Sequence, residues 1–225
     1  MAFLRSVLHL LWMLVTVVPW AIVLLLASLF ARGEPLYWFA AGWLRVAMWG
    51  ARWILGIRHR VQGMEHLPQD PRAGAVLLVK HQSTYETFLM PTLMPHPLAY
   101  VFKKELLSQR AQAFHRVVQQ GKRLLEQGVW IIMFPEGTRI PRGQKGQYKT
   151  GGSRLAIDTG APVIPIAVTS AKCWPRKAFV KYPGVVDVSI GPAIASAGRK
   201  ADELMAEVEA WIEAEMRRLD PEAYR

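Results

Sequence analysis

A histidine and a glutamate five residues apart, His81 and Glu86, are the residues best suited to acid–base chemistry in this chain. An imidazole exchanges protons near neutral pH, and a carboxylate can hold one ring nitrogen and stabilise the imidazolium that forms. The apolar run at residues 74–79 predicts a strand, and residues 83–84 can cap a short helix that ends before Pro91. His81 is therefore expected at the carboxyl end of a strand, where open α/β sheets bind ligands.

The spacing of this pair restricts how the two side chains can meet. Neighbours on one helical face are three or four residues apart, so His81 must lie outside the helix if it contacts Glu86. A second interpretation is a capping box, in which Glu86 satisfies only the backbone N–H of Ser83. This stretch alone leaves both interpretations open.

A second apolar run, residues 130–134, also ends in a turn that carries chemistry. Residues 134–139 read Phe-Pro-Glu-Gly-Thr-Arg, and residues 163–167 read Val-Ile-Pro-Ile-Ala. Together with His-(four residues)-Glu at residues 81–86, these motifs resemble the glycerolipid acyltransferase family, especially the 1-acylglycerol-3-phosphate acyltransferases. That family has a His-(four residues)-Asp motif, this same six-residue motif and a Val-Ile-Pro-Ile-type strand. The resemblance covers roughly residues 51–192 and is specific because the motifs occur in order.

This resemblance implies transfer of a fatty acyl group from acyl-CoA or acyl-carrier protein to the 2-hydroxyl of lysophosphatidate, which gives phosphatidate. No cofactor is implied beyond the acyl thioester co-substrate. The transfer needs a base for the hydroxyl proton, and His81 is the candidate, with Glu86 as its orienting partner. The sequence contains no Gly-x-Ser-x-Gly nucleophile motif, so we expect direct transfer without an acyl-enzyme. The amides at the start of the helix expected at residues 84–90 are candidate oxyanion donors.

A phosphate on the acceptor calls for a bidentate cation, and Arg139 is the obvious one. The resemblance carries acceptor binding onto Glu136, Gly137, Thr138 and Arg139, and suggests Lys104 as a second phosphate contact. The alternatives without a role in binding are that Gly137 only allows the turn and that Lys104 is an ordinary solvated charge.

The chain departs from the family pattern in two places. Glu86 replaces the usual aspartate, and the family's second motif is missing where residues 106–108 run directly into a helical stretch around Arg110. These departures leave two alternatives open. One is an acyltransferase for a different lysolipid, and the other is a non-catalytic lipid-binding relative.

Composition favours a lipid-facing enzyme. The 225 residues are 52% hydrophobic and carry a net charge of +11, which suits a protein drawn to an anionic leaflet. Nucleic-acid binding is disfavoured, because the basic residues gather around the site loops and no nucleic-acid motif occurs. Arg142, Lys145 and Lys149 are expected to face headgroups or an acidic carrier protein. The single cysteine, Cys173, excludes an internal disulfide, and no Cys/His cluster suggests a metal site.

The first 60 residues are expected to anchor the chain to a membrane, and residues 61–225 to form the acyltransferase domain. Residues 10–30 carry no charge, and 21 residues of helix span about 30 Å, the hydrocarbon thickness of a bilayer. A signal peptide is the alternative. The tryptophan-rich residues 36–56 suit a helix at headgroup level, or else a helix packed on the domain. If the first helix crosses the bilayer, the excess of arginine after it places the catalytic domain on the cytoplasmic side of the inner membrane.

The rest of the chain alternates between strands and helices, which predicts an α/β fold with a mostly parallel sheet flanked by helices. Strands are expected at residues 74–80, 98–102, 129–134, 162–168 and 185–190, after a strand and a turn-rich link at residues 58–72. Helices are expected at residues 84–90, 108–127, 150–159 and 199–219.

Overall fold

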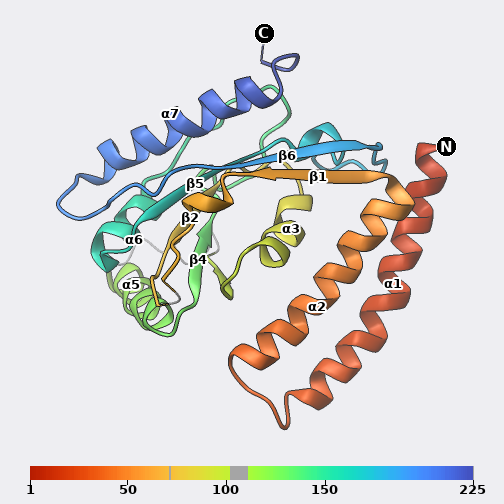
Figure 1. The fold of residues 1–225 in the computed structure, drawn as a ribbon, viewed down its shortest axis with the longest axis horizontal. Helices are drawn as coiled ribbons and strands as arrows, with labels where there is room; N and C mark the ends of the chain where they lie inside the picture. Colours follow the sequence, from red (N-terminus) through yellow and green to blue (C-terminus); the bar gives the residue numbers. More distant parts are fainter. Residues whose placement is uncertain (71, 102–110, 225) are drawn as a thin grey trace. The chain divides into compact units, whose positions relative to one another are not determined.

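The computed structural model describes residues 1–70, 72–101 and 111–224 (Figure 1). The chain divides into two compact units. The helical unit contains Met1–Arg60, Gln82–Pro97 and Ser170–Val186, so it holds the predicted anchor together with two later segments. The sheet unit contains Val61–His81, Leu98–Thr169 and Asp187–Arg225.

A six-stranded sheet has the order β1-β6-β5-β2-β4-β3. Its central strands are β2, β4 and β5, which pair in parallel, and β3 adds to β4 in the same direction. Strand β6 pairs with β5 antiparallel. Strands buried on both faces read as unbroken apolar runs, which is why the sequence shows them so clearly. The strand bounds are Ile57–Gln62 (β1), Val76–Val79 (β2), Leu98–Tyr100 (β3), Trp130–Met133 (β4), Val163–Val168 (β5) and Gly184–Ile190 (β6).

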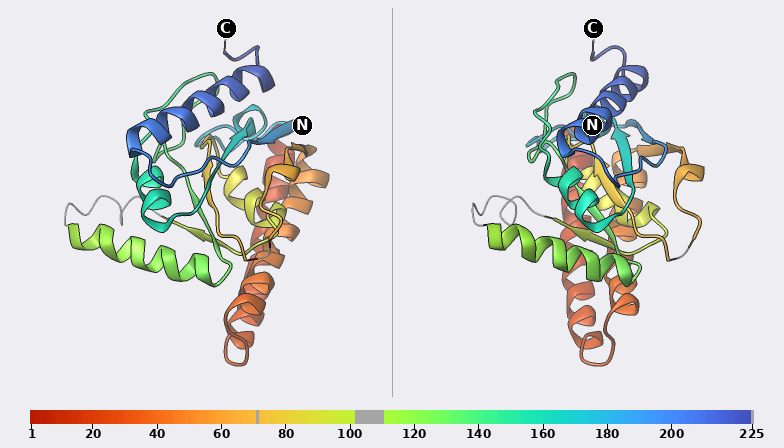
Figure 2. Two further views of the ribbon diagram at one scale, coloured as in Figure 1. Left: turned by 60° about the vertical axis from the view of Figure 1, so that its left-hand side comes forward. Right: turned by 90° about the vertical axis from the view of Figure 1, so that its left-hand side faces the viewer.

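Three helices of the sheet unit pack against one face of the sheet (Figure 2). They are α5 (Ala111–Glu126), α6 (Gly151–Thr159) and α7 (Ala201–Leu219). The core between these layers is built from alternate residues of the strands and apolar residues of the helices: Val76, Leu78, Ile131, Met133, Val163, Ala167, Leu155, Leu204, Val208 and Ile212. Alternation within each strand sends one set of side chains to this face. The predicted α/β class and the parallel sheet are therefore confirmed.

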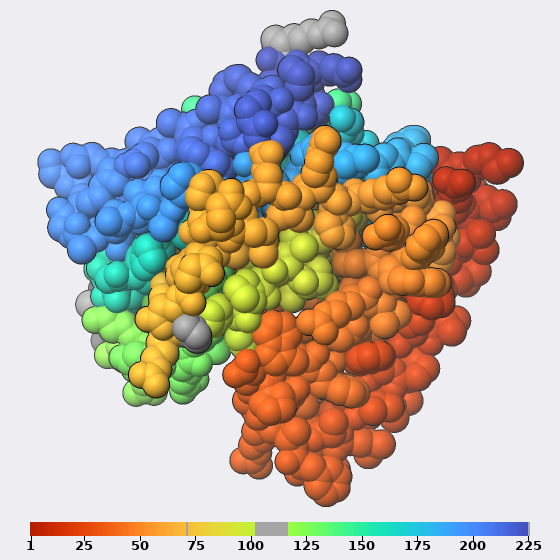
Figure 3. All heavy atoms as spheres, in the orientation of Figure 1, coloured from red at the N-terminus to blue at the C-terminus, as the bar shows by residue number. Residues whose placement is uncertain are grey.

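In the helical unit, α1 (Ala2–Ala27) and α2 (Glu34–Gly50) form an antiparallel hairpin and lie side by side (Figure 3). The indole N–H of Trp12 donates to the Val46 carbonyl and that of Trp20 to the Phe39 carbonyl, each at 3.1 Å. Because these bonds use main-chain acceptors, they fix the distance between the two helices. A short π-helical segment, Ala51–Leu55, follows α2.

The first helix begins at Ala2, ahead of the uncharged stretch at residues 10–30, because nothing in the first turns breaks it and the Ser6 hydroxyl donates to the Ala2 carbonyl. Within the described residues, α1 alone is long and apolar enough to cross a membrane by length and composition. The second helix packs on a further helix of the unit, while its position at headgroup level stays a prediction. Its Trp43 ring lies edge-on to Phe88, with ring centroids 6.0 Å apart.

Helix α3 (Tyr85–Leu93) does not end before Pro91 as predicted. Proline costs a helix one backbone hydrogen bond, yet Leu89, Met90 and Pro91 are all buried, and their packing offsets that loss. The helix ends at Met94, which has extended backbone angles (ψ 142°) because the residue before Pro95 is pushed out of the helical region.

Candidate functional site

His81 lies two residues after the end of β2 and is held by the turn at residues 134–140 of the same unit. Its ring stacks on Phe134 with centroids 3.8 Å apart and planes at 18°. Its backbone N–H donates to Glu136 Oε2 at 2.9 Å, and its carbonyl accepts the Ile140 N–H at 2.7 Å. The ring and both backbone groups of His81 therefore contact one short segment, so the candidate base and the Phe-Pro-Glu-Gly-Thr-Arg turn form one piece.

The turn requires glycine at its centre. Gly137 has a φ of +64°, which L side chains rarely adopt, and its N–H donates to the Phe134 carbonyl at 2.9 Å. Thr138 is exposed and Arg139 is half-buried. The Nε of Arg139 is buried without a hydrogen-bond partner in the part of the chain that the structure describes. An unmet guanidinium donor beside the candidate base is the feature expected of an anion-binding arginine.

A lysine lies against the same turn. A Cβ placed on Gly137 would lie 3.4 Å from Lys149 Nζ, and the Lys149 N–H donates to the Pro135 carbonyl at 2.9 Å. Lys149 was expected only to face headgroups or a carrier protein. Its position at the turn makes it a further cation available to an acceptor phosphate.

The carboxylate of Glu136 is bonded to groups of the protein itself. Its side chain is fully buried, and its Oε1 accepts from Lys80 Nζ at 2.7 Å while Oε2 accepts the His81 N–H. Burial raises the pKa of this carboxyl, against the attraction of the Lys80 ammonium. Contact between Glu136 and the acceptor stays a prediction, and the geometry describes a residue that organises the turn.

Glu86 lies in the helical unit and closes the turn before α3. Its Oε1 accepts the N–H groups of Gln82 at 2.6 Å and Ser83 at 2.7 Å, and its Oε2 accepts the Ser83 hydroxyl at 3.0 Å. The bond from the Ser83 N–H that the capping interpretation requires is therefore present, and the pairing of Glu86 with His81 stays a prediction. The Tyr85 N–H donates to Ser83 Oγ. Because side chains occupy the amides of Gln82, Ser83 and Tyr85, these three groups are not available to an oxyanion.

Lys104 lies outside the described residues, as does the whole of segment 102–110, where the sequence lacks the family's second motif. The phosphate contact suggested for Lys104 therefore stays a prediction.

Sequence reasoning missed a buried ionic cluster next to His81. Lys80 Nζ lies 2.6 Å from Glu213 Oε1 of α7 as well as 2.7 Å from Glu136 Oε1, and the Tyr148 hydroxyl donates to Glu213 Oε1 at 2.9 Å. The available signal was a lysine that ends a wholly apolar run. Nothing local marks its partner Glu213, which is 133 residues away.

Comparison with known proteins identifies the class of molecule. The Acyltransferase family model matches residues 58–169. A curated 1-acyl-sn-glycerol-3-phosphate acyltransferase of Pseudomonas aeruginosa is 39% identical over 201 residues, covering 80% of this chain and 77% of that protein. The chain belongs to the acyltransferase family. A mouse 1-acyl-sn-glycerol-3-phosphate acyltransferase alpha is 27% identical over 72% of this chain and 64% of its own length.

The fold of this acyltransferase also has a solved counterpart. The crystal structure of the lysophosphatidate acyltransferase PlsC from Thermotoga maritima matches 97% of this chain and 99% of that chain, with a TM-score of 0.76 and 23% identity. Because this identity is low, the match supports the fold alone.

In an acyltransferase, the site geometry assigns clear chemical capacities. His81 can accept a proton at the end of a central strand, and Arg139 and Lys149 supply positive charge at the adjoining turn. Residues 1–70, 72–101 and 111–224 contain no group of three or more His, Cys, Asp or Glu side chains that could hold a metal ion.

Proposed function

We propose that this acyltransferase moves a fatty acyl group from acyl-CoA or acyl-carrier protein to the 2-hydroxyl of lysophosphatidate, giving phosphatidate in phospholipid biosynthesis. The observation that carries the proposal is the 39% identity to the Pseudomonas aeruginosa enzyme over 77% of its length. Support from the geometry is that the candidate base His81 is bonded through its carbonyl to Ile140, the residue after Arg139. One small acceptor could therefore place its hydroxyl at His81 and its phosphate at Arg139.

The proposed reaction is a single displacement at the thioester. His81 takes the proton from the acceptor hydroxyl, the hydroxyl oxygen attacks the carbonyl carbon, and the C–S bond breaks. The proton then passes to the departing thiolate, so the products are an ester and a free thiol. Glu86 would orient His81 and stabilise its protonated form, and Arg139 with Lys149 would hold the acceptor phosphate.

Thiol release from a long-chain acyl-CoA tests this reaction, with and without lysophosphatidate and with protein in detergent or lipid. We expect acceptor-dependent release that His81→Ala abolishes and that the matched control His96→Ala keeps. Acyl-carrier protein is tried as the second donor. No release with either donor, while lipid binding persists, would move the protein to the non-catalytic alternative.

An acceptor panel separates lysophosphatidate from other lysolipids. Arg139→Ala should raise the KM for lysophosphatidate about tenfold or more, since a charged hydrogen bond contributes about 1.5–3 kcal/mol. If the enzyme prefers a phosphate-free acceptor and Arg139→Ala leaves the KM unchanged, lysophosphatidate is not the substrate.

We also propose that the α1–α2 hairpin anchors the protein in the inner membrane, with the catalytic domain on the cytoplasmic side. Large apolar side chains are exposed along α1, and the hairpin tip carries Leu29 and Phe30, exposed by 71% and 91%. The start of α1 lies close to the segment that follows α2, since a Cβ on Gly56 would lie 3.4 Å from Arg5 Nη1. A hairpin of this kind would enter a bilayer tip first and return to the side from which it entered.

The base of the hairpin has the composition of a membrane interface. The segment at residues 174–182 contacts the start of α1: Phe179 lies 5.6 Å from Phe3 between ring centroids, and the Lys181 N–H donates to Ser6 Oγ. It combines the exposed rings of Phe179 and Tyr182 with the exposed cation of Lys177. Aromatic rings and cations together favour an anionic headgroup layer.

A membrane-impermeant maleimide tests the orientation, after the native thiol has been replaced by Cys173→Ala. With Glu65→Cys in the sheet unit, we expect no labelling in intact spheroplasts and labelling once the spheroplasts have been lysed. Labelling before lysis would place the catalytic domain on the opposite side of the membrane.

A further inference from the structure

The strongest further feature is the buried cluster next to His81, formed by Lys80, Glu136, Glu213 and Tyr148. We will call these four residues the ionic cluster. The Lys80 side chain is fully buried, and its ammonium bonds two carboxylates at 2.7 Å and 2.6 Å. Charges removed from water in this way cost free energy, and an apolar replacement of the whole set is often no less stable. Stability alone is therefore a weak reason for a fold to retain such a cluster.

Glu136 connects the ionic cluster to the candidate base. One of its oxygens accepts from Lys80 and the other accepts the His81 N–H. The ammonium thus fixes the carboxylate, and the carboxylate fixes the backbone of the residue whose ring must reach the acceptor hydroxyl. Ile140 holds the His81 carbonyl from the other side.

Helix α7 connects to the same point through Glu213. This carboxylate accepts from Lys80 and from the Tyr148 hydroxyl, and the Gln144 carbonyl accepts from Lys80 at 3.4 Å. The loop that joins the Phe-Pro-Glu-Gly-Thr-Arg turn to α6 is therefore held by the same ammonium. Lys80, the residue that follows β2, therefore contacts groups from the turn, the loop and α7.

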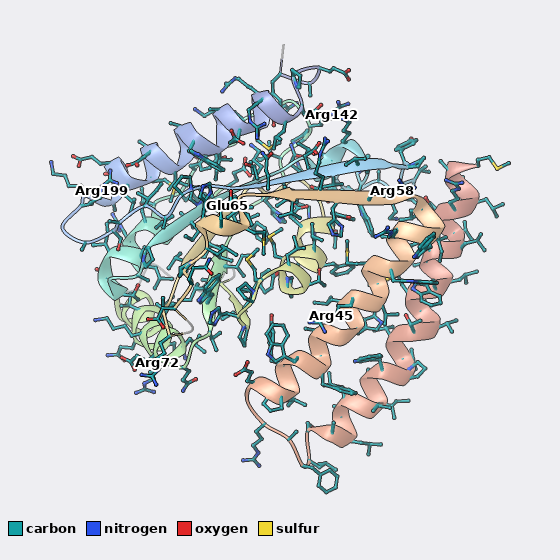
Figure 4. The ribbon with its side chains drawn as sticks, in the orientation of Figure 1. Arg45, Arg58, Glu65, Arg72, Arg142 and Arg199 are labelled. Carbon is teal, nitrogen blue, oxygen red and sulfur yellow. The ribbon has the colours of Figure 1, made fainter. Side chains whose placement is uncertain are left out.

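The loop is also fastened to α7 along its length. Arg142 forms a bidentate pair with Asp220, with both bonds at 2.7 Å, beside the C-terminal end of α7 (Figure 4). Lys145 pairs with Glu209 one turn before Glu213. These contacts leave the loop little freedom, so the position of Arg139 depends on α7.

The charges of the ionic cluster do not balance if Lys80, Glu136 and Glu213 are all ionised, because one ammonium then faces two carboxylates. Glu213 Oε2 is buried without a hydrogen-bond partner among the described residues. A cluster assembled only for stability would leave neither an excess charge nor an unmet oxygen in the interior.

We propose that Lys80 is a positioning residue, whose ammonium aligns His81 and Arg139 with each other through Glu136 and Glu213. The proposal rests on the proposed acyl transfer and assigns Glu136 to this alignment rather than to substrate contact. Small displacements of a base or a phosphate ligand are costly to catalysis, since about 1 Å of misplacement can cost about a hundredfold in rate.

The decisive variant is the triple substitution Lys80→Met, Glu136→Gln and Glu213→Gln. It removes all the charges together, so no ion is left buried and unpaired, and the amide oxygen at position 136 can still accept the His81 N–H. We expect an unfolding midpoint near that of the parent and a kcat lowered by about tenfold to a hundredfold. Amide hydrogen exchange should be faster in peptides covering residues 134–142 and unchanged in those covering β5. Lys200→Met, an exposed lysine of the same unit, is the matched control.

The proposal is overturned if the triple variant keeps parental stability, parental kcat and parental exchange at residues 134–142. Should that variant fail to fold, the double substitution Lys80→Gln and Glu213→Gln, which leaves Glu136 as the only carboxyl of the cluster, is judged by the same three measurements. Parental turnover is measured in the same assay. An inactive parent would remove the proposed reaction, while the exchange data would still decide the alignment.

Discussion

The length of the Glu86 side chain determines what this residue can do. The glutamate arm reaches back to two backbone amides and a hydroxyl of its own turn. Aspartate, one methylene shorter, would lose at least one of these buried bonds. We therefore expect Glu86→Asp to lower the free energy of unfolding by about 1–3 kcal/mol, although aspartate is the usual residue of the family motif. Urea unfolding in detergent measures this.

Glu86→Gln separates the structural role of this residue from its electrostatic one. The amide keeps the length of the side chain and an acceptor for the two amides, and its NH₂ can donate to Ser83 Oγ. We expect near-parental stability with a kcat at least about tenfold lower, because the charge that would stabilise protonated His81 is gone. Parental kcat in this variant would show that Glu86 only closes the turn.

Burial of Glu136 makes a prediction about pH. Its pKa is raised above the ordinary 4.5, so the native carboxyl holds its proton at pH values where the unfolded chain has already lost it. The stability contributed by this group is fully present below pH 4.5 and is lost as the pH rises through the raised pKa. The free energy of unfolding of the parent, relative to Glu136→Gln, should therefore fall from pH 4.5 upward. A rise instead would show that the Lys80 attraction outweighs burial.

At the level of the element, the loop at residues 140–149 depends on an uneven ion pair. Asp220 is 2% exposed and Arg142 is 38% exposed. Removing the arginine leaves a buried carboxylate at the C-terminal end of a helix, where negative charge is unfavourable. Removing the aspartate leaves a guanidinium that water can reach. We expect Arg142→Ala to cost about 2 kcal/mol and Asp220→Ala clearly less, measured by urea unfolding. Equal costs would mean that the pair acts only by mutual attraction.

Elements were predictable where one local pattern decides them. Strands β2, β4 and β5 are buried on both faces, so each reads as an apolar run, and the turn at residues 134–139 keeps its motif. The end of α3 was not predictable, because packing around Pro91 outweighs the proline's local preference. The ionic cluster was not predictable for a related reason. A contact between Lys80 and Glu213 leaves no periodicity or spacing in the sequence.

At the level of the whole molecule, membrane attachment should divide into an apolar and an electrostatic part. The apolar part belongs to α1, where Leu8, Val15 and Leu25 are exposed by 48%, 69% and 69%. Replacing all three by serine should weaken binding to vesicles by about a thousandfold, at about 1.5 kcal/mol for each side chain. Flotation with lipid vesicles measures this, and Met64→Ser, an exposed apolar residue of the sheet unit, is the control. Undiminished flotation would exclude α1 as the anchor.

The electrostatic part belongs to the base of the hairpin, at residues 174–182, and to the exposed Lys172 just before it. Each lysine near an anionic surface contributes about 1 kcal/mol, and this attraction is screened by salt. Lys172→Glu with Lys177→Glu should therefore weaken binding to anionic vesicles by more than tenfold at low salt, and much less to zwitterionic ones. Lys200→Glu changes the net charge in the same sense, so it shows how much of the loss comes from overall charge. If Lys200→Glu weakens binding as much per charge, the base of the hairpin has no special role. If it does not, the cations at the base face the lipid, and hairpin and base form one membrane-binding surface.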